Sequence, residues 1–138
     1  MQKTYILDTS VAIAWYLSES FSQSARTWQD KAILGEINLI APSLHYWEFA
    51  NVLRTHVRRD DLEKEIALEL YKTHLLAPVR VVNPDMNDVL TTALHYESTS
   101  YDAVYISLSL ELSIPLLTAE RSTRAWVKKL GKNAKTIV

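Results

Sequence analysis

The sequence predicts an α/β protein in which a parallel sheet of four to five strands is covered by helices on both faces. Short uncharged runs of β-favouring residues alternate with longer segments of helical periodicity. Only two glycines and four prolines occur, which disfavours the tight hairpins of an all-β protein. Right-handed crossovers between successive strands then place helices on both faces of the sheet. The length suits one domain over residues 1–138, and a hydrophobic fraction of 48% supplies its core.

The first segments set this pattern. Residues 4–7 are predicted to form a short strand without charge. Residues 11–17 follow as an apolar helix, with polar N-cap candidates at positions 8–10. A second helix is expected over residues 22–34, and Gly35 stands where a left-handed C-terminal cap belongs.

A second strand is predicted over residues 37–41, where Pro42 ends it. Ser43 can cap the next helix, which runs to about Arg59. The apolar residues expected on the inner side of this helix are Leu44, Trp47, Val52 and Leu53. Charge is dense between Arg54 and Glu65, which predicts a solvated junction with a further helix over residues 62–75.

The C-terminal half continues the alternation. A third strand over residues 79–82 precedes Asp85, which can cap a helix over residues 86–97. Ser100 can cap the following helix, whose apolar stripe is Tyr101, Val104, Tyr105, Leu108 and Leu112. A fourth strand (115–118), a final helix (122–130) and an edge strand (136–138) complete the predicted order.

Composition excludes several classes of protein. The absence of cysteine removes disulfide frameworks and thiolate metal sites and suits a reducing compartment. A formal net charge of −1 gives no overall attraction to nucleic acid, so such binding needs local basic patches. Neither a signal peptide nor an apolar run of about 20 residues is found, so we expect a cytoplasmic protein without membrane contact.

Four acids occupy equivalent places in this scheme. They follow the first strand, lie one turn into the helix after the second strand, open the helix at Ser100, and follow the fourth strand; they are Asp8, Glu48, Asp102 and Glu120. Segments that leave the carboxyl ends of parallel strands converge on one rim of the sheet. Acids gathered there repel one another unless a cation neutralises them, and Mg²⁺ or Mn²⁺ prefers such hard oxygen ligands.

Each acid also fits a simpler interpretation. Asp8 fits equally as a helix cap, Asp102 as a first-turn acid that complements the helix dipole, and Glu120 as an ordinary acid before a helix. Glu48 is different because its neighbours are aromatic or apolar, and a carboxylate buried there needs a partner. The metal hypothesis therefore depends on the four acids together.

Other polar residues add less. Basic residues cluster twice, at Arg54, Arg58 and Arg59 and at Arg121, Arg124, Lys128 and Lys129. The second cluster follows Glu120 directly, so it suits either a phosphodiester substrate or an ordinary solvated helix face. The four histidines are scattered without ligand spacing, and we assign them no role.

Four motifs in order resemble those of PIN-domain ribonucleases. They are Leu7-Asp8-Thr9-Ser10-Val11, Glu48-Phe49-Ala50-Asn51-Val52-Leu53, Ser100-Tyr101-Asp102-Ala103-Val104-Tyr105 and Leu116-Leu117-Thr118-Ala119-Glu120-Arg121. The nearest resemblance is to VapC-type toxins of prokaryotic toxin–antitoxin pairs, and it covers essentially the whole chain.

This resemblance implies an α/β/α sandwich and an endoribonuclease that depends on Mg²⁺ or Mn²⁺. Asp8, Glu48 and Asp102 match the three principal acids of the family, whereas Glu120 stands where the family usually has Asp. The family resemblance further implies a homodimer and inhibition by a small antitoxin. We expect Asp8 and Asp102 to hold the principal ion, Glu48 to bind it directly or through water, and Glu120 to be the first candidate for a second ion.

Two other functions fit parts of the pattern. A receiver or phosphatase domain also has acids at strand ends, but here Asp8 lacks a second adjacent acid and the third strand ends in Asn83-Pro84. A PIN-like domain without activity, serving as an RNA- or protein-binding module, fits the sequence better because Glu120 departs from the usual residue.

Overall fold

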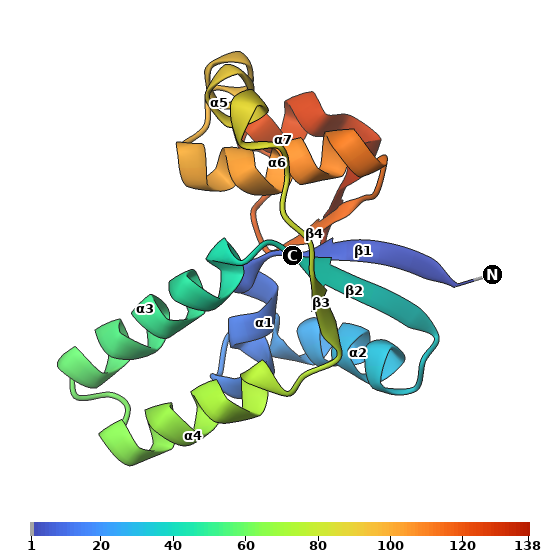
Figure 1. Cartoon of the computed structure of the whole chain (residues 1–138). Coiled ribbons are helices and arrows are strands. Elements are labelled where there is room, and N and C mark those ends of the chain that lie inside the picture. The colour runs from blue at the N-terminus through green and yellow to red at the C-terminus, as the bar shows by residue number, and fades with distance from the viewer. Residues whose placement is uncertain (1) are drawn as a thin grey trace.

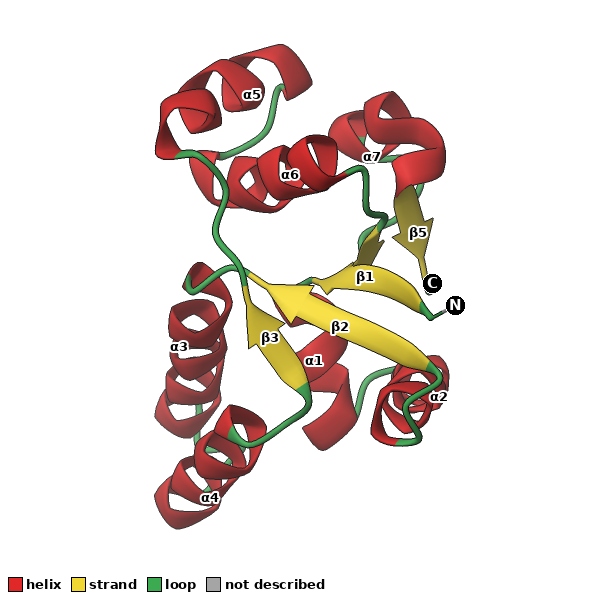
Figure 2. Cartoon of the chain, turned by 45° about the vertical axis from the view of Figure 1, so that its right-hand side comes forward, coloured by secondary structure: helices red, strands yellow, loops and turns green. Residues whose placement is uncertain are grey.

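The computed structural model describes residues 2–138 as a parallel five-stranded sheet between two layers of helices, as the sequence predicts. The strands are β1 (Lys3–Leu7), β2 (Ile37–Ala41), β3 (Val79–Val81), β4 (Leu116–Thr118) and β5 (Ala134–Thr136), in the spatial order β3-β2-β1-β4-β5. The central position of β1 places its carboxyl end between those of β2 and β4 (Figure 2).

Helices cover both faces of this sheet (Figure 1). One layer contains α1 (Thr9–Tyr16), α2 (Ser22–Ile33), α3 (Leu44–Arg58) and α4 (Lys64–Leu75). The other contains α5 (Val89–Tyr96), α6 (Ser100–Leu112) and α7 (Ala125–Leu130). Short 3₁₀ turns at Met86–Asp88 and Gly131–Asn133 precede α5 and β5.

Two hydrophobic cores lie on the two sides of the sheet, because successive residues of a strand point to opposite faces. Leu7 packs with Val11 and Phe49 in the core beneath α1 and α3. Its neighbour Ile6 packs with Ile106 in the core beneath α6 and α7. All five of these side chains are fully buried.

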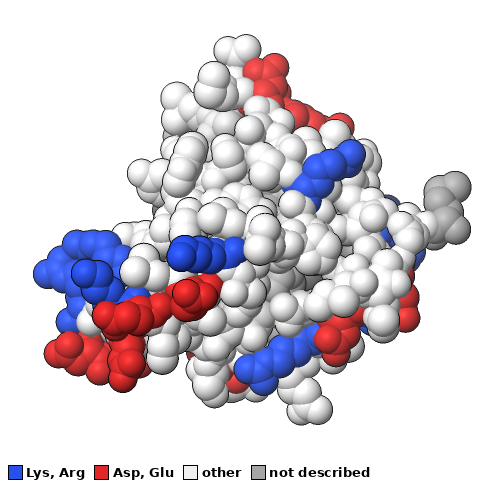
Figure 3. All heavy atoms as spheres, turned by 60° about the horizontal axis from the view of Figure 1, so that its bottom comes forward, with Lys and Arg blue, Asp and Glu red and all other residues white. Residues whose placement is uncertain are grey.

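Several local predictions are confirmed. Gly35 adopts the left-handed conformation, with φ of 75°. The side chain of Asp85 accepts a 3.0 Å hydrogen bond from the backbone N–H of Asn87 and so caps the turn before α5. The junction between α3 and α4 is solvated: Arg58, Arg59 and Asp60 are exposed, and Figure 3 shows positive and negative side chains gathered on this side of the molecule.

Other local predictions are wrong. Trp47 was expected inside but is 64% exposed, because it lies on the outer side of α3. The N-cap of α6 is Thr99 rather than Ser100, and Ser43 hydrogen-bonds the side chain of Asn83 instead of capping α3. The last helix begins at Ala125 rather than at residue 122.

The apolar stripe predicted for α6 is also only partly buried. Tyr105 and Leu108 lie in the core, but Tyr101 is 65% exposed and Leu112 is 43% exposed. The buried residues of α6 therefore lie in its central part, between Ala103 and Ser109. The edge strand spans Ala134–Thr136, two residues before its predicted position.

Candidate functional site

The four predicted acids line one open pocket of about 360 Å³ at the carboxyl edge of the sheet. Asp8 follows β1, and its backbone N–H donates to the carbonyl of Leu117 in the adjacent strand β4 at 3.0 Å. Glu48 projects from the second turn of α3, and Asp102 from the first turn of α6. The convergence predicted from parallel topology is therefore present in the structure.

Asp8 stands at the N-cap position of α1, but its side chain does not cap the helix. Its Oδ2 instead accepts hydrogen bonds from the hydroxyls of Ser10 (3.0 Å) and Thr118 (2.7 Å). The pKa of Asp8 is raised to about 6, mainly by burial; the two hydrogen bonds oppose this rise, and the charges of Glu48 and Asp102 contribute to it. The sequence left Asp8 open as a helix cap or as a metal ligand. The structure does not support the capping role of its side chain.

Glu48 is anchored through one of its two oxygens. Oε1 accepts hydrogen bonds from the hydroxyls of Thr9 (3.0 Å) and Tyr105 (2.7 Å), which come from α1 and α6. Burial raises the pKa of Glu48, the two hydroxyls lower it, and the charge of Asp102 raises it again. The acid in aromatic surroundings thus has partners, and these partners orient its carboxylate towards the pocket.

Asp102 is held by its backbone. Its N–H donates to Oγ1 of Thr99 at 3.0 Å, which makes Thr99 the cap and leaves the Asp102 carboxylate facing the pocket. Burial raises the pKa of Asp102, whereas the cation of Arg124 lowers it. A guanidinium near this acid places positive charge at the edge of the site.

Glu120 lines the same pocket but has a different partner. Its Oε2 lies 3.4 Å from Nη1 of Arg124, four residues later, and its backbone N–H donates to the hydroxyl of Thr118. The acids whose charges raise the pKa of Asp8 are Glu48 and Asp102. Three of the four acids therefore interact closely, and Glu120 is turned towards a cation.

The chemistry of these donors suits a hard divalent cation. Three carboxylates share a confined space, burial raises the pKa of each, and repulsion from a neighbouring acid adds to this for Asp8 and Glu48. A cation would relieve both effects. Within residues 2–138 no three acid or histidine side chains stand close enough, as placed, to enclose an ion. A cation held by one or two of these carboxylates, with water completing its shell, is compatible with this spacing.

Sequence reasoning missed several polar residues here. Thr118 and Tyr105 lie within the quoted motifs, but nothing local shows that they hydrogen-bond Asp8 and Glu48, which come from distant segments. His45 and His74, to which we assigned no role, are fully buried with their Nε2 atoms 2.8 Å apart. One signal for His45 was available in the sequence: it lies three residues before Glu48, and therefore one turn away on the same helix.

The chain matches one known domain family and is similar in fold to solved structures. The sequence pattern of the PIN domain matches residues 5–125. Among solved structures, PAE2754 from Pyrobaculum aerophilum is similar, with a TM-score of 0.73, 20% identity, and coverage of 99% of this chain and 92% of that one. A toxin–antitoxin complex from Klebsiella pneumoniae has a chain with a TM-score of 0.61 and 12% identity, covering 97% of this chain and 98% of that one.

A search of curated proteins finds no match. At these identities the two solved structures establish a shared fold and no more. No helix of residues 2–138 is long and apolar enough to cross a membrane. The domain match spans most of the chain and contains Asp8, Glu48, Asp102 and Glu120, and on that ground the protein belongs to the PIN domain family, whose members are generally nucleases that use divalent metals.

Proposed function

We propose that this protein is a metal-dependent endoribonuclease, with Asp8, Glu48 and Asp102 as its principal acids and Mg²⁺ or Mn²⁺ as its cofactor. We further propose that residues 1–138 act as a single catalytic domain in the cytoplasm. The observation that carries the proposal is the convergence of three acids from β1, α3 and α6 on one pocket, with a raised pKa for each. A fold gains no stability from crowding carboxylates, so a cation-dependent function explains the arrangement better than a structural one.

The residues of the chain divide the work of such a site. Asp8 and Asp102 would hold the ion, and Glu48 would bind it directly or through water. A bound ion would supply Lewis-acid stabilisation of the phosphodiester and a water of lowered pKa. Thr118 and Ser10 hold the Asp8 carboxylate in place, and Thr9 and Tyr105 hold that of Glu48.

Positive charge beside the acids supports a phosphodiester substrate. Arg124 is close enough to Asp102 to lower its pKa, and it also contacts Glu120 at 3.4 Å. A phosphate group entering the pocket would meet this guanidinium beside the acids, and would compete with Glu120 for it. RNA as the particular nucleic acid follows from the family resemblance.

The proposal extends to two protein partners. The similar structure from Klebsiella pneumoniae is a toxin–antitoxin complex, which supports a small antitoxin as the inhibitor of this chain. A second copy of the chain is the other partner. Large exposed apolar side chains on α5, Leu90 (65%) and Leu94 (73%), offer a surface for it.

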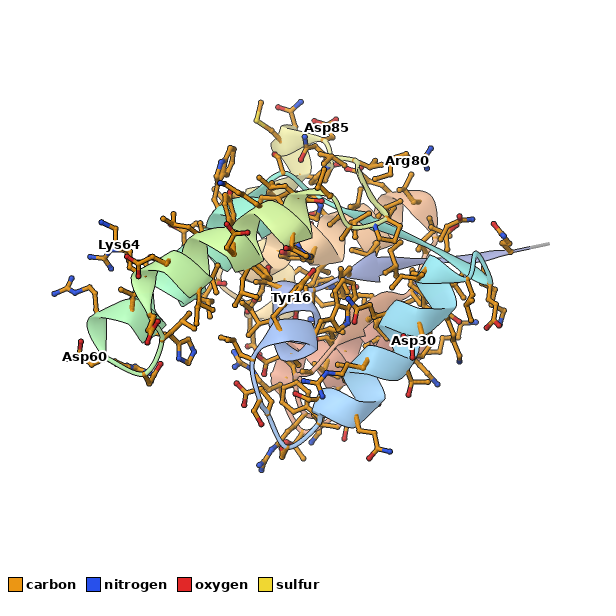
Figure 4. The ribbon with its side chains drawn as sticks, turned by 90° about the horizontal axis from the view of Figure 1, so that it is seen from below. Tyr16, Asp30, Asp60, Lys64, Arg80 and Asp85 are labelled. Carbon is orange, nitrogen blue, oxygen red and sulfur yellow. The ribbon has the colours of Figure 1, made fainter. Side chains whose placement is uncertain are left out.

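Cleavage assays test the enzymatic proposal. Purified protein is incubated with structured RNA in Mg²⁺, in Mn²⁺ and in EDTA, together with the variants Asp8→Asn and Asp102→Asn. Asp30→Asn is the matched control, because Asp30 lies exposed on α2 (Figure 4) and does not line the pocket. We expect cleavage with either metal for the wild type and the control, and loss with EDTA or either active-site variant. Cleavage that survives both treatments would exclude the metal mechanism.

A binding module without catalytic activity is the second candidate. The contact between Glu120 and Arg124 favours it, because Glu120 is then engaged away from the other three acids. A protein that binds RNA in EDTA as tightly as in Mg²⁺, and cleaves none, would support this function instead.

A further inference from the structure

A continuous line of buried polar groups leads away from Glu48 into the protein. Oγ1 of Thr9 contacts Glu48 on one side and Nδ1 of His45 (3.4 Å) on the other. Nε2 of His45 contacts Nε2 of His74 at 2.8 Å, and Nδ1 of His74 contacts the hydroxyl of Tyr16 at 3.0 Å. Five side chains from α1, α3 and α4 are therefore linked, and the proposed chemistry uses only Glu48 and Thr9 among them.

Both imidazoles are expensive to bury. His45 and His74 have no exposed surface and lie against Phe49, whose ring stacks on that of His74 at 4.2 Å. Burial lowers the pKa of His45 to about 3 and that of His74 to about 4, so both rings are neutral at neutral pH. Two apolar rings would fill the same space without losing hydration. Packing alone therefore leaves the choice of two histidines unexplained.

Neutrality determines where the protons lie. A neutral imidazole has one N–H and one bare nitrogen. An ionised Glu48 accepts the protons of the Thr9 and Tyr105 hydroxyls, so both hydroxyl oxygens present lone pairs to Nδ1 of His45. Nδ1 of His45 must therefore carry the proton.

The rest of the chain follows from this tautomer. If Nδ1 of His45 is protonated, its Nε2 is bare and must accept a hydrogen bond from Nε2 of His74. Nδ1 of His74 is then bare in turn and accepts from the hydroxyl of Tyr16. Every donor then points towards Glu48, starting from Tyr16 at the end of α1, which Figure 4 labels.

We propose that His45 and His74 are positioning residues that hold the Thr9 hydroxyl in the orientation that anchors Oε1 of Glu48 and leaves Oε2 for a divalent cation. The two histidines act through Thr9 and do not contact the metal site themselves. His74 also connects α4 to the acids, so the position of this helix influences how Glu48 is presented. This inference rests on the proposed metal site, but its central claim concerns the protein without metal.

The first test measures tautomers in the unmodified, metal-free protein. Long-range ¹H–¹⁵N correlation spectra distinguish imidazoles protonated on Nδ1 from those protonated on Nε2. We expect His45 to carry its proton on Nδ1 and His74 on Nε2. Protonation of His45 on Nε2, or a charged ring at either position at neutral pH, would overturn the proposal.

The second test uses two variants of His74 and calorimetric titration with Mn²⁺. The amide nitrogen of Gln reaches the position of Nε2, whereas that of Asn reaches the position of Nδ1. We expect His74→Asn to weaken Mn²⁺ binding about tenfold and His74→Gln to restore most of this loss. His95→Asn and His95→Gln are the matched controls, because His95 is exposed on α5.

The outcomes distinguish a failure of the positioning role from a failure of the proposed metal site. Equal Mn²⁺ affinity for wild type and both folded His74 variants would reduce the pair to core packing and overturn the positioning role. A wild-type protein that binds no Mn²⁺ would instead contradict the proposed metal site, and the tautomers would still decide the direction of the chain. If His74→Asn fails to fold, Tyr16→Phe replaces it, since it removes only the terminal hydroxyl; unchanged Mn²⁺ affinity and unchanged tautomers in that variant would overturn the proposal.

Discussion

The hydroxyl of Tyr105 donates a 2.7 Å hydrogen bond to Oε1 of Glu48, across 57 positions of sequence. Thr9 donates to the same oxygen at 3.0 Å. Two donors on one oxygen orient the carboxylate and leave the other oxygen free for a cation. The acid that was hardest to explain in the sequence is therefore the one with the most specific support in the structure.

Removing either donor should weaken metal binding. In Thr9→Val or Tyr105→Phe, Oε1 keeps a single hydrogen bond, so we expect Mn²⁺ affinity to fall about tenfold. The free energy of unfolding should fall by about 1–2 kcal/mol, because the remaining buried groups lose a partner. Titration calorimetry and urea unfolding measure the two effects. Tyr101→Phe is the control, since Tyr101 is 65% exposed on the same helix, and an equal loss in that variant would contradict the prediction.

Asp102→Asn should leave the melting temperature of the metal-free protein unchanged or raise it. Burial raises the pKa of Asp102 despite the cation of Arg124, and the charge of Asp102 raises the pKa of Glu48. The bond from the backbone N–H of Asp102 to Thr99 survives the substitution. Thermal unfolding in EDTA, with Asp30→Asn as reference, measures the difference. A clear drop in melting temperature would mean that Asp102 serves mainly to stabilise the helix.

Asp8 should give the metal-free protein a distinctive dependence on pH. The pKa of Asp8 is about 6 in the folded protein, against 3.8 for an ordinary exposed aspartate. Between these two pH values the folded state therefore holds a proton that the unfolded chain has lost. Its contribution to stability is therefore full below about pH 4 and lost as the pH rises through 6. His45 and His74 have the opposite effect on the pH dependence of stability. Burial lowers their pKa values, so their contribution to the free energy of unfolding grows as the pH rises.

The informative quantity is therefore the difference between Asp8→Asn and wild type. The variant should gain about 2–3 kcal/mol of unfolding free energy relative to wild type as the pH rises from about 4 to about 7. Urea unfolding in EDTA across this range measures it. A constant difference would show that the pKa of Asp8 is not raised in the folded protein.

Glu120 should matter less than the other acids. Because Arg124 neutralises it at 3.4 Å, we expect Glu120→Gln to slow RNA cleavage less than about tenfold, against more than about 100-fold for Asp102→Asn. Single-turnover rates in saturating Mn²⁺ make the comparison. A loss as large as that of Asp102→Asn would make Glu120 a required ligand.

The exposed apolar face of α5 should mediate self-association. Leu90 and Leu94 lie four residues apart and therefore on one side of the helix. We expect sedimentation of the wild type as a dimer and of Leu90→Glu/Leu94→Glu as a monomer. Leu76→Glu is the control, because Leu76 is 87% exposed at the end of α4. A monomeric wild type would contradict the prediction.

Local patterns in the sequence were sufficient for the order of strands and helices, the parallel sheet and the rim on which Asp8, Glu48 and Asp102 meet. Strand length, helical periodicity and the geometry of crossovers act within a few residues or within one connection, so they can be read along the chain. The orientations of the side chains at that rim could not be read from the sequence in this way. Thr118 lies 110 positions from Asp8, His45 lies 29 from His74, and Trp47 is exposed only because of how α3 is rotated. Such contacts depend on how distant elements pack together, and only the tertiary structure decides them.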